Sequence, residues 1–246
     1  DPDILLSEAW FRDKETAGYV NHRATPASRG SGAAGYPLEA MLDRGHGLAT
    51  ACYGDFDPDV DDGFRNGIHA LFPRAASGPA AGSEWGAIGA WAWGLGRMAA
   101  HLLTLPQVDG KKLVAVGHSR LGKAALWAGV QDARFAIVIS NNSGAGGAAL
   151  ARRNYGETVR DLNTSFPHWF CRNYHLYSGN EGALPVDQHA LLALVAPRPL
   201  YVASATEDRW ADPKGEFLSA KLAEPVYALF GLPGLGVETR PSPDTP

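Results

Sequence analysis

The sequence predicts an α/β fold with a mostly parallel central sheet and helices on both faces, arranged as a three-layer sandwich. Short apolar runs of strand length alternate along the chain with segments typical of helices. Three of these runs end in polar residues, as strands do where open parallel sheets bind their ligands. With 246 residues, of which 45% are hydrophobic and 20% charged, the chain can build one large core. We therefore expect a single domain over residues 1–246.

The expected elements follow one another in chain order. A stretch rich in Gly, Ala and Ser at residues 24–35 indicates a surface loop, which precedes a helix over 36–44 and a buried strand over 47–53. Residues 84–105 are apolar on nearly every face and stop before Pro106, which is typical of a long helix packed against a sheet. The remaining expected elements are strands over 113–116, 135–139 and 199–203 and helices over 123–130 and 216–230.

Composition excludes several kinds of partner. The formal net charge is -4 and the basic residues form no cluster, so we expect no binding to nucleic acid. The richest apolar stretch, residues 85–105, is broken by Gly and Arg, so we expect no membrane span. Two cysteines, Cys52 and Cys171, are too few for a disulfide framework, and the sequence leaves open whether they pair.

A serine between small residues follows the expected strand at 113–116. The segment Gly117-His118-Ser119-Arg120-Leu121-Gly122 resembles the G-x-S-x-G turn, called the nucleophile elbow, with the second glycine one place late. A solvated turn serine is the alternative. Because the turn joins a strand to a helix, Ser119 would lie at the carboxyl edge of the sheet beside backbone N–H groups. We predict that Ser119 is the nucleophile.

Two basic residues follow the serine. The residue after such a nucleophile normally donates an oxyanion-hole N–H, and here it is Arg120, whose guanidinium could add a charged donor. Its alternative role is a surface salt bridge. Lys123 lies four residues after Ser119 and would point toward the same mouth of the site, unless it is an ordinary solvated helix lysine.

Five motifs stand in one order over about a hundred residues. They are GHSRLGK at 117–123, NNSGAGGAALARR at 141–153, FPHWF at 166–170, LPVDQH at 184–189 and ATEDRWADP at 205–213. With these motifs the chain resembles the glucuronoyl esterases of carbohydrate esterase family 15, particularly their bacterial branch. The segments DPDILLSEAW and DGFRNGIHALF are similar as well, so the resemblance covers nearly all of the chain.

The resemblance implies an α/β-hydrolase that acts as a serine esterase, with no metal and no organic cofactor. Its substrate would be the ester between the carboxyl group of (4-O-methyl)glucuronate on xylan and an alcohol of lignin. The implied partners are therefore glucuronoxylan and lignin-carbohydrate esters. We expect a monomer, and the family implies a secreted or periplasmic location.

The resemblance also assigns roles to particular residues. Ser119 resembles the family's nucleophile and Arg120 its oxyanion-stabilising arginine. Lys123 and Glu157 resemble residues that bind sugar hydroxyls, and Trp210 resembles the aromatic residue against which the uronate packs. These residue types suit those tasks, because charged groups bond strongly to hydroxyls and an indole offers an apolar face with an N–H. Without the resemblance, Glu157 would be interpreted as a solvated acid and Trp210 as a core residue.

The catalytic acid departs from the pattern of many family members. They carry a Glu directly before the SGxGG stretch, where this chain has Asn142, and an amide cannot stabilise an imidazolium by charge. Asp208 matches the alternative position of some bacterial members. It follows the expected strand at 199–203, as a triad acid requires, although a loop cap is its alternative role. We predict that Asp208 is the acid.

The position of the catalytic base also departs from the family pattern. In this class of hydrolase the order is Ser, acid, His, yet every histidine precedes Asp208: His22, His46, His69, His101, His118, His168, His175 and His189. The chain thus resembles a fragment that lacks both ends of the family's domain, with the catalytic histidine expected beyond Pro246. His189 could substitute, but we interpret it as structural.

Two other functions remain open at this point. The elbow and triad do not reveal the acyl group, so an acetyl xylan esterase or another carbohydrate esterase is one alternative. A non-catalytic glycan-binding relic is the other, because a missing base would suggest it. The sugar-binding residues favour the glucuronoyl ester, and the retained Ser119 and Arg120 argue against decay. The chain by itself is expected to have little or no esterase activity.

Overall fold

The computed structural model describes residues 19–20, 23–28, 35–74 and 77–241. The chain divides into two compact units, residues 1–73 and residues 74–246, and each is described by itself. The expectation of a single domain stays a prediction. All six predicted site residues belong to the second unit.

The first unit contains short elements. Strands β1 (Tyr19–Val20) and β2 (Arg23–Ala24) pair antiparallel, and helix α1 (Leu38–Asp43) confirms the helix expected over 36–44. The 3-10 helices among the described residues of this unit are η2 (Pro26–Ser28), η4 (Tyr53–Asp55) and η5 (Gly67–Leu71). Residues 29–34 of the expected loop lie outside the described residues.

The buried strand expected over 47–53 was wrong. Residues 47–52 form no regular element, and they are exposed or half-buried. An extended segment becomes a strand only where a neighbouring strand takes up its backbone hydrogen bonds, and none of the described strands pairs with this one.

The second unit is built on a parallel sheet in the order β3-β4-β5. The strands β3 (Leu113–His118), β4 (Phe135–Asn141) and β5 (Leu200–Ala203) confirm the three predicted strands. Their register pairs His118 with Asn141 and Asn141 with Ala203, so the three strands end at one edge. The loops that begin at Ser119, Asn142 and Ser204 therefore leave the sheet side by side.

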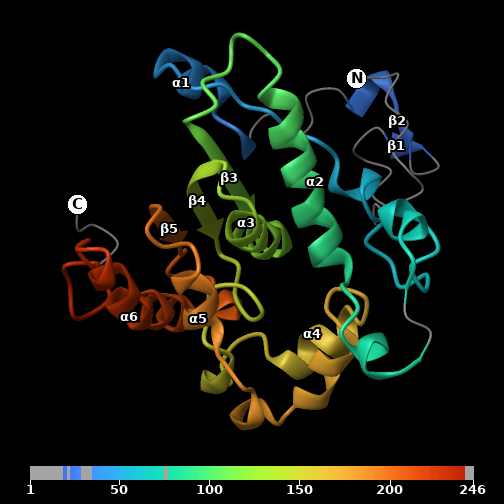
Figure 1. Ribbon diagram of the computed structural model, residues 1–246, viewed down its shortest axis with the longest axis vertical. Coiled ribbons are helices and arrows are strands. Elements are labelled where there is room, and N and C mark those ends of the chain that lie inside the picture. Colours follow the sequence, from blue (N-terminus) through green and yellow to red (C-terminus); the bar gives the residue numbers. More distant parts are fainter. Residues whose placement is uncertain (1–18, 21–22, 29–34, 75–76, 242–246) are drawn as a thin grey trace. The chain divides into compact units, whose positions relative to one another are not determined.

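Four helices cover one face of this sheet (Figure 1). They are α2 (Ala87–Leu102), α3 (Arg120–Gln131), α5 (Gln188–Ala193) and α6 (Pro213–Leu229). One buried cluster joins α2 and α3 to β3 and β4, and a second joins α3, α5 and α6 to β4 and β5. The helices expected over 84–105, 123–130 and 216–230 are confirmed as α2, α3 and α6, with α6 beginning one turn earlier.

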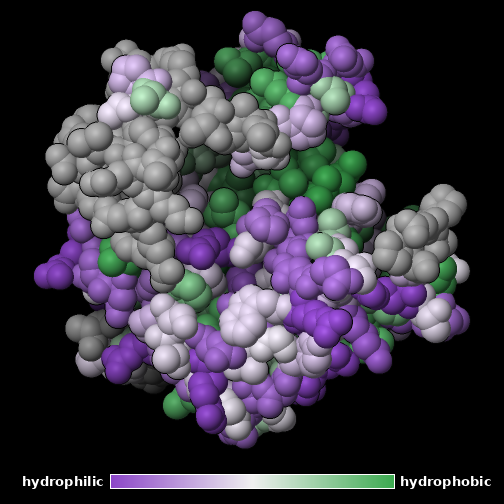
Figure 2. All heavy atoms as spheres, turned by 180° about the vertical axis from the view of Figure 1, so that it is seen from behind, coloured by the Kyte–Doolittle hydropathy of each residue, from purple (hydrophilic) through white to green (hydrophobic). Residues whose placement is uncertain are grey.

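Apolar side chains also occupy the opposite face of the sheet. Val114, Val116, Ile137 and Tyr201 alternate with buried strand residues and are exposed. On the side of the molecule seen in Figure 2, apolar side chains gather in the middle of the view, whereas the surface below them is mostly polar. Apolar residues on both faces of a strand are typical of the interior sheet of a three-layer fold. The sequence predicted helices on both faces of the sheet. Among the described residues, helices pack on one face only.

Several short helices were not predicted. Helix α4 (Val159–Ser165) begins with a capping box in which the Thr158 hydroxyl accepts from the Asp161 N–H and the Asp161 carboxylate accepts from the Thr158 N–H. The others are α5 and the 3-10 helices η6 (Pro79–Gly82), η7 (Ala151–Arg153), η8 (Arg172–Tyr177), η9 (Glu181–Ala183) and η10 (Arg209–Ala211). One or two turns are too short for a hydrophobic period to be recognised.

Membrane-spanning helices, metal-binding clusters and a disulfide are all absent from the described residues. None of their helices is long and apolar enough to cross a membrane. No group of three or more His, Cys, Asp or Glu side chains among them could hold a metal ion. The thiols of Cys52 and Cys171, whose pairing the sequence left open, are both free.

Two helical glycines provide a matched test of packing. A Cβ added at Gly129 in α3 would lie 2.3 Å from the Val138 Cγ2 atom on β4, whereas at Gly96 in α2 the nearest atom would be 3.5 Å away. We expect Gly129→Ala to lower the free energy of unfolding by about 1–3 kcal/mol through overpacking. Gly96→Ala should raise it by about 0.5–1 kcal/mol through helix propensity. Urea denaturation measures both, and equal effects of the two substitutions would contradict the packing of α3 on β4.

Candidate active site

Ser119 lies on a strained turn between β3 and α3. Its backbone has φ 56° and ψ -125°, in the left-handed region that costs an L-residue about 1–3 kcal/mol. The Ser119 N–H donates to the Asn141 carbonyl at 2.9 Å, and the Ser119 carbonyl accepts from the Gly122 N–H at 2.9 Å, starting the helix. This is the strand-turn-helix geometry that the sequence predicted.

The two glycines of the turn are required by close approaches. A Cβ at Gly117 would lie 2.0 Å from the Leu121 carbonyl oxygen, a distance that no side chain permits. A Cβ at Gly122 would lie 3.0 Å from the Ser143 Cβ atom, on the loop after β4. The second glycine is therefore one place late because position 122, rather than 121, is where the helix meets the neighbouring loop.

The Arg120 side chain lies over two stacked aromatic rings. Phe166 and Trp169 stack with centroids 3.8 Å apart and nearly parallel planes. The Arg120 guanidinium carbon is 5.2 Å from the Phe166 centroid and 4.7 Å from the Trp169 centroid. These cation–π contacts hold the guanidinium beside the elbow. Both aromatic rings belong to the FPHWF motif at 166–170.

Lys123 is buried, so the alternative of a solvated helix lysine was wrong. Its side chain is 3% exposed, and its Nζ donates to the Ser143 carbonyl at 2.7 Å and to the Glu157 Oε2 at 3.3 Å. Burial lowers the pKa of the Lys123 ammonium, and the charge of Glu157 opposes that shift. The structure thus brings two of the predicted sugar-binding residues into one ion pair.

The burial of Glu157 and Trp210 is the reverse of what their residue types alone would suggest. Glu157 is nearly buried, with 10% of its side chain exposed, and Trp210 is 58% exposed rather than part of the core. The Glu157 N–H donates to the Trp210 carbonyl at 2.8 Å. Trp210, in the 3-10 helix η10, is therefore fixed next to the Lys123–Glu157 pair.

Asp208 is hydrogen-bonded to Asn142, the residue that replaces the more usual acid. The Asn142 Nδ2 donates to the Asp208 Oδ2 at 2.6 Å, and the Asn142 Oδ1 accepts from the Ala205 N–H at 2.9 Å. Asp208 also caps η10, because its Oδ1 accepts from the Ala211 N–H at 3.3 Å, so the loop-cap alternative holds as well. Within the described part of the chain, no histidine hydrogen-bonds to the Asp208 carboxylate.

Sequence reasoning missed a buried carboxyl group behind these loops. Glu216, on the first turn of α6, is fully buried. Its Oε1 accepts from the Gly144 N–H at 2.9 Å and from the Ser143 hydroxyl at 3.3 Å, and its Oε2 accepts from the Ser204 hydroxyl. One side chain thus binds the loop after β4 and the loop after β5. An acid at the start of an expected helix was the sequence signal, but that pattern usually indicates only a favourable helix dipole.

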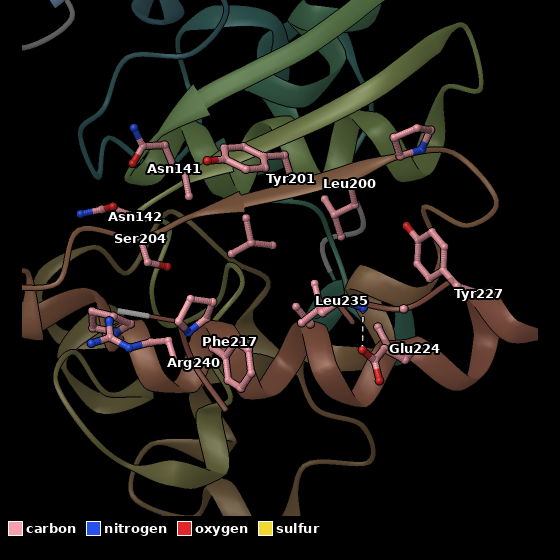
Figure 3. A pocket seen from close by; sticks show the side chains of 18 of the residues that line it. Asn141, Asn142, Leu200, Tyr201, Ser204, Phe217, Glu224, Tyr227, Leu235 and Arg240 are labelled. Atoms are coloured by element: carbon pink, nitrogen blue, oxygen red, sulfur yellow. Dashed lines mark hydrogen bonds between the residues drawn. The ribbon is translucent and has the colours of Figure 1, made fainter. Parts of the chain in front are cut away.

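A cleft of about 1030 Å³ lies beside β5 and α6. Figure 3 shows Asn142 and Ser204 toward one end of it and Tyr227 and Glu224 toward the other. Its described lining includes none of the six predicted site residues, and it meets the site at Asn142. The cleft therefore adjoins the predicted site without containing it.

The geometry defines a class of protein. A serine on a strained turn after one parallel strand, with an acid after the next strand but one of the same sheet, is the arrangement of serine hydrolases with the α/β-hydrolase fold. The helix that follows the serine points its N-terminal N–H groups toward the place where an oxyanion would form.

Sequence comparison gives the family. A family model described as "Glucuronyl esterase, fungi" matches residues 80–231, and the chain belongs to the glucuronyl esterase family. It is 48% identical over 244 residues to "Carbohydrate esterase MZ0003" from an unknown prokaryotic organism, covering 99% of this chain and 56% of that protein. It is 32% identical over 215 residues to "4-O-methyl-glucuronoyl methylesterase 1" of Wolfiporia cocos, covering 82% of this chain and 52% of that protein.

Comparison with solved structures agrees with this family assignment. A promiscuous CE15 esterase from a marine bacterial metagenome superimposes with a TM-score of 0.89 at 47% identity, covering 100% of this chain and 62% of that one. A glucuronoyl esterase of Sporotrichum thermophile, solved in complex with methyl 4-O-methyl-β-D-glucopyranuronate, gives a TM-score of 0.55 at 31% identity over 60% of this chain and 43% of that one. The predicted α/β-hydrolase fold is thereby confirmed, while the chain spans only about two to three fifths of the length of these relatives.

The buried Glu216 carboxyl predicts a pH dependence of stability. Burial raises its pKa above the ordinary value of 4.5, and the three hydrogen-bond donors reduce that shift without cancelling it. The stabilising contribution of Glu216 is therefore complete below the unfolded-state pKa and declines as the pH rises through the folded-state value. Thermal unfolding from about pH 4 to pH 8 should show the wild type losing stability relative to Glu216→Gln.

Glu224 on the same helix provides a control of opposite sign. Its hydrogen bond with Lys221 lowers the pKa of the Glu224 carboxyl. The wild type should therefore gain a little stability relative to Glu224→Gln as the pH rises over the acid range. A Glu216→Gln curve parallel to that of the wild type would contradict the assignment of a raised pKa.

Proposed function

We propose that the protein is a serine esterase that cleaves the ester between (4-O-methyl)glucuronate of xylan and lignin alcohols, with Ser119 as nucleophile. The observation that carries the proposal is the strained Ser119 turn next to the buried Lys123–Glu157 pair. Relatives named as 4-O-methyl-glucuronoyl methylesterases, and the Sporotrichum thermophile complex with a methyl glucuronate ester, support the same substrate class. No cofactor enters the chemistry proposed.

The proposed reaction proceeds by acyl transfer. The Ser119 hydroxyl attacks the ester carbonyl while an imidazole accepts its proton, and the resulting oxyanion is stabilised by backbone N–H groups and by the Arg120 guanidinium. The imidazolium then protonates the departing lignin alcohol. Water, activated by the same imidazole, attacks the glucuronoyl-enzyme and releases the acid.

The acid of the proposed triad is Asp208. Its carboxylate would orient the imidazole and stabilise its positive charge. Because no described histidine hydrogen-bonds to Ser119 or Asp208, the base is proposed to be a histidine outside the described residues. Asn142 keeps Asp208 in place by its amide hydrogen bond.

The proposed sugar site consists of Lys123, Glu157 and Trp210. An ammonium has three N–H donors, and two of those of Lys123 go to Ser143 and Glu157, so one remains for a sugar hydroxyl. The Glu157 carboxylate can accept a hydroxyl proton, and the exposed indole of Trp210 can pack on the apolar face of the uronate.

A wider ester range is the second candidate function. It is favoured by one observation, because the similar metagenomic structure is described as a promiscuous esterase. The proposed partners are glucuronoxylan and lignin-carbohydrate esters. Since such polymers do not enter cells, we also propose a secreted or periplasmic location. We propose that the protein is a monomer.

Substrate comparison tests the proposed function. The native protein should release alcohol from benzyl and methyl glucuronate and act poorly on acetylated sugars, because the proposed sugar site would bind a uronate as the acyl part of the ester. Ser119→Ala is the control and should lower kcat by about a millionfold. Alcohol release is followed by chromatography. Equal or faster turnover of acetyl xylan would favour the wider ester range.

The identity of the acid is tested by paired substitutions. Asp208→Ala should lower kcat about ten-thousandfold with little change in thermal stability, since the imidazole loses its charged partner. Asn142→Ala removes one hydrogen bond to a carboxylate, worth about 1.5–3 kcal/mol, and should cost roughly 10- to 100-fold. Steady-state kinetics on benzyl glucuronate measures both losses of kcat. A larger loss for Asn142→Ala than for Asp208→Ala would contradict the assignment of Asp208 as the acid.

A further inference from the structure

Tyr155 is an exposed aromatic residue on a strained turn. Its side chain is 47% exposed, and its two neighbours both have left-handed backbone, with φ 50° at Asn154 and φ 67° at Gly156. A non-glycine residue in that region is uncommon, and strain of this kind concentrates at binding and catalytic sites. The turn therefore holds an aromatic ring in water at some cost in conformational energy.

The turn is fixed to the loop that carries Trp210. The Arg153 Nε donates to the Asp212 Oδ2 at 2.7 Å and a terminal Arg153 nitrogen donates to Oδ1 at 3.2 Å, which is a bidentate pair with a buried carboxylate. A Cβ at Gly156 would lie 2.4 Å from the Trp210 carbonyl oxygen, so only glycine allows this approach. With the Glu157–Trp210 backbone hydrogen bond, these contacts set the distance between the two aromatic residues.

Arg153 also holds the Tyr155 ring. Its guanidinium carbon lies 5.6 Å from the ring centroid, while its nitrogens bind Asp212. Because Asp212 is buried and accepts from the Gly215 N–H at 3.0 Å, the guanidinium has little freedom. A ring that rests on a fixed cation loses little further entropy when a ligand packs on it.

The surroundings of Tyr155 combine apolar faces with charged hydrogen-bonding groups. Trp210 stands on the loop bonded to this turn, and Glu157, two residues further along, pairs with Lys123. A pyranose ring presents C–H groups on its faces and hydroxyls on its rim, so it suits aromatic side chains alternating with charged donors and acceptors. Tyr155 therefore lies on the chain segment that carries Glu157 and that is hydrogen-bonded to Trp210.

We propose that Tyr155 forms a second aromatic subsite, which binds a neutral sugar ring of the polysaccharide chain adjoining the uronate. The inference rests on the proposed function, because it extends the site of the acyl sugar. Tyr155 lies on the segment of Glu157 and next to the loop of Trp210, the residues assigned to the acyl sugar. It does not lie on the Ser119 elbow, from which the alcohol departs. A sugar ring of the chain, rather than the aromatic ring of the alcohol, is therefore the ligand.

Kinetics on two matched esters tests the subsite. The native protein, Tyr155→Ala and Tyr155→Phe are compared on benzyl glucuronate and on the benzyl ester of glucuronate attached to a xylo-oligosaccharide. Tyr155→Ala should raise KM for the oligosaccharide ester roughly three- to tenfold, with kcat unchanged and benzyl glucuronate unaffected. Tyr155→Phe should resemble the wild type, since the ring is kept. Tyr36→Ala, which removes another exposed tyrosine, is the matched control and should change neither substrate.

Other outcomes overturn the proposal. Equal effects of Tyr155→Ala on both esters, or no effect on either, would show that no sugar beyond the uronate is bound there. With methyl glucuronate as a third substrate, a penalty on the benzyl ester that is absent from the methyl ester would assign Tyr155 to the alcohol instead.

A binding measurement separates this inference from the proposed function. If the native protein hydrolyses neither ester, the proposed function fails, and calorimetric titration with an unesterified glucuronoxylo-oligosaccharide decides the subsite. Binding that Tyr155→Ala weakens supports the subsite even then. Absence of binding, or binding that Tyr155→Ala leaves unchanged, overturns it.

Discussion

The arrangement of the site depends on the buried carboxyl group of Glu216. It accepts hydrogen bonds from Ser143 and Gly144, after β4, and from Ser204, after β5. The Ser143 carbonyl in turn accepts from Lys123 on α3. A helix and two strand ends are thereby joined through one side chain. If that carboxyl moved, Lys123 and the loop leading to Asp208 would lose a common support.

The Lys123–Glu157 pair is better explained by binding than by stability. Taking both charges out of water costs several kcal/mol per ion, and their attraction rarely returns more than that. An apolar pair of the same volume would fold as well. A buried ammonium with a donor left over, beside a carboxylate with acceptor capacity left over, is instead suited to a ligand rich in hydroxyls.

The sequence predicted the parts of the site that depend on local pattern. Apolar runs located β3, β4 and β5, and the glycines around Ser119 located the elbow. Contacts between distant segments could not be predicted, because they depend on strand register. Asn142 and Asp208 are 66 residues apart, and the register of β4 with β5 brings their loops together. The segment 47–53, which is exposed or half-buried, shows the same limit, since an apolar run becomes a strand only with a partner.

The rings beneath Arg120 bear on how rapidly an oxyanion can be stabilised. A free arginine side chain samples many rotamers, and restricting them costs about 2 kcal/mol. Here the stacked Phe166 and Trp169 rings confine the guanidinium when the protein folds, before any ester arrives. In the proposed reaction this charge would be preorganised, so little reorientation of the protein would be needed as negative charge developed on the carbonyl oxygen. A pair of aromatic residues that need not touch the reacting atoms would thus lower the reorganisation energy of the proposed reaction.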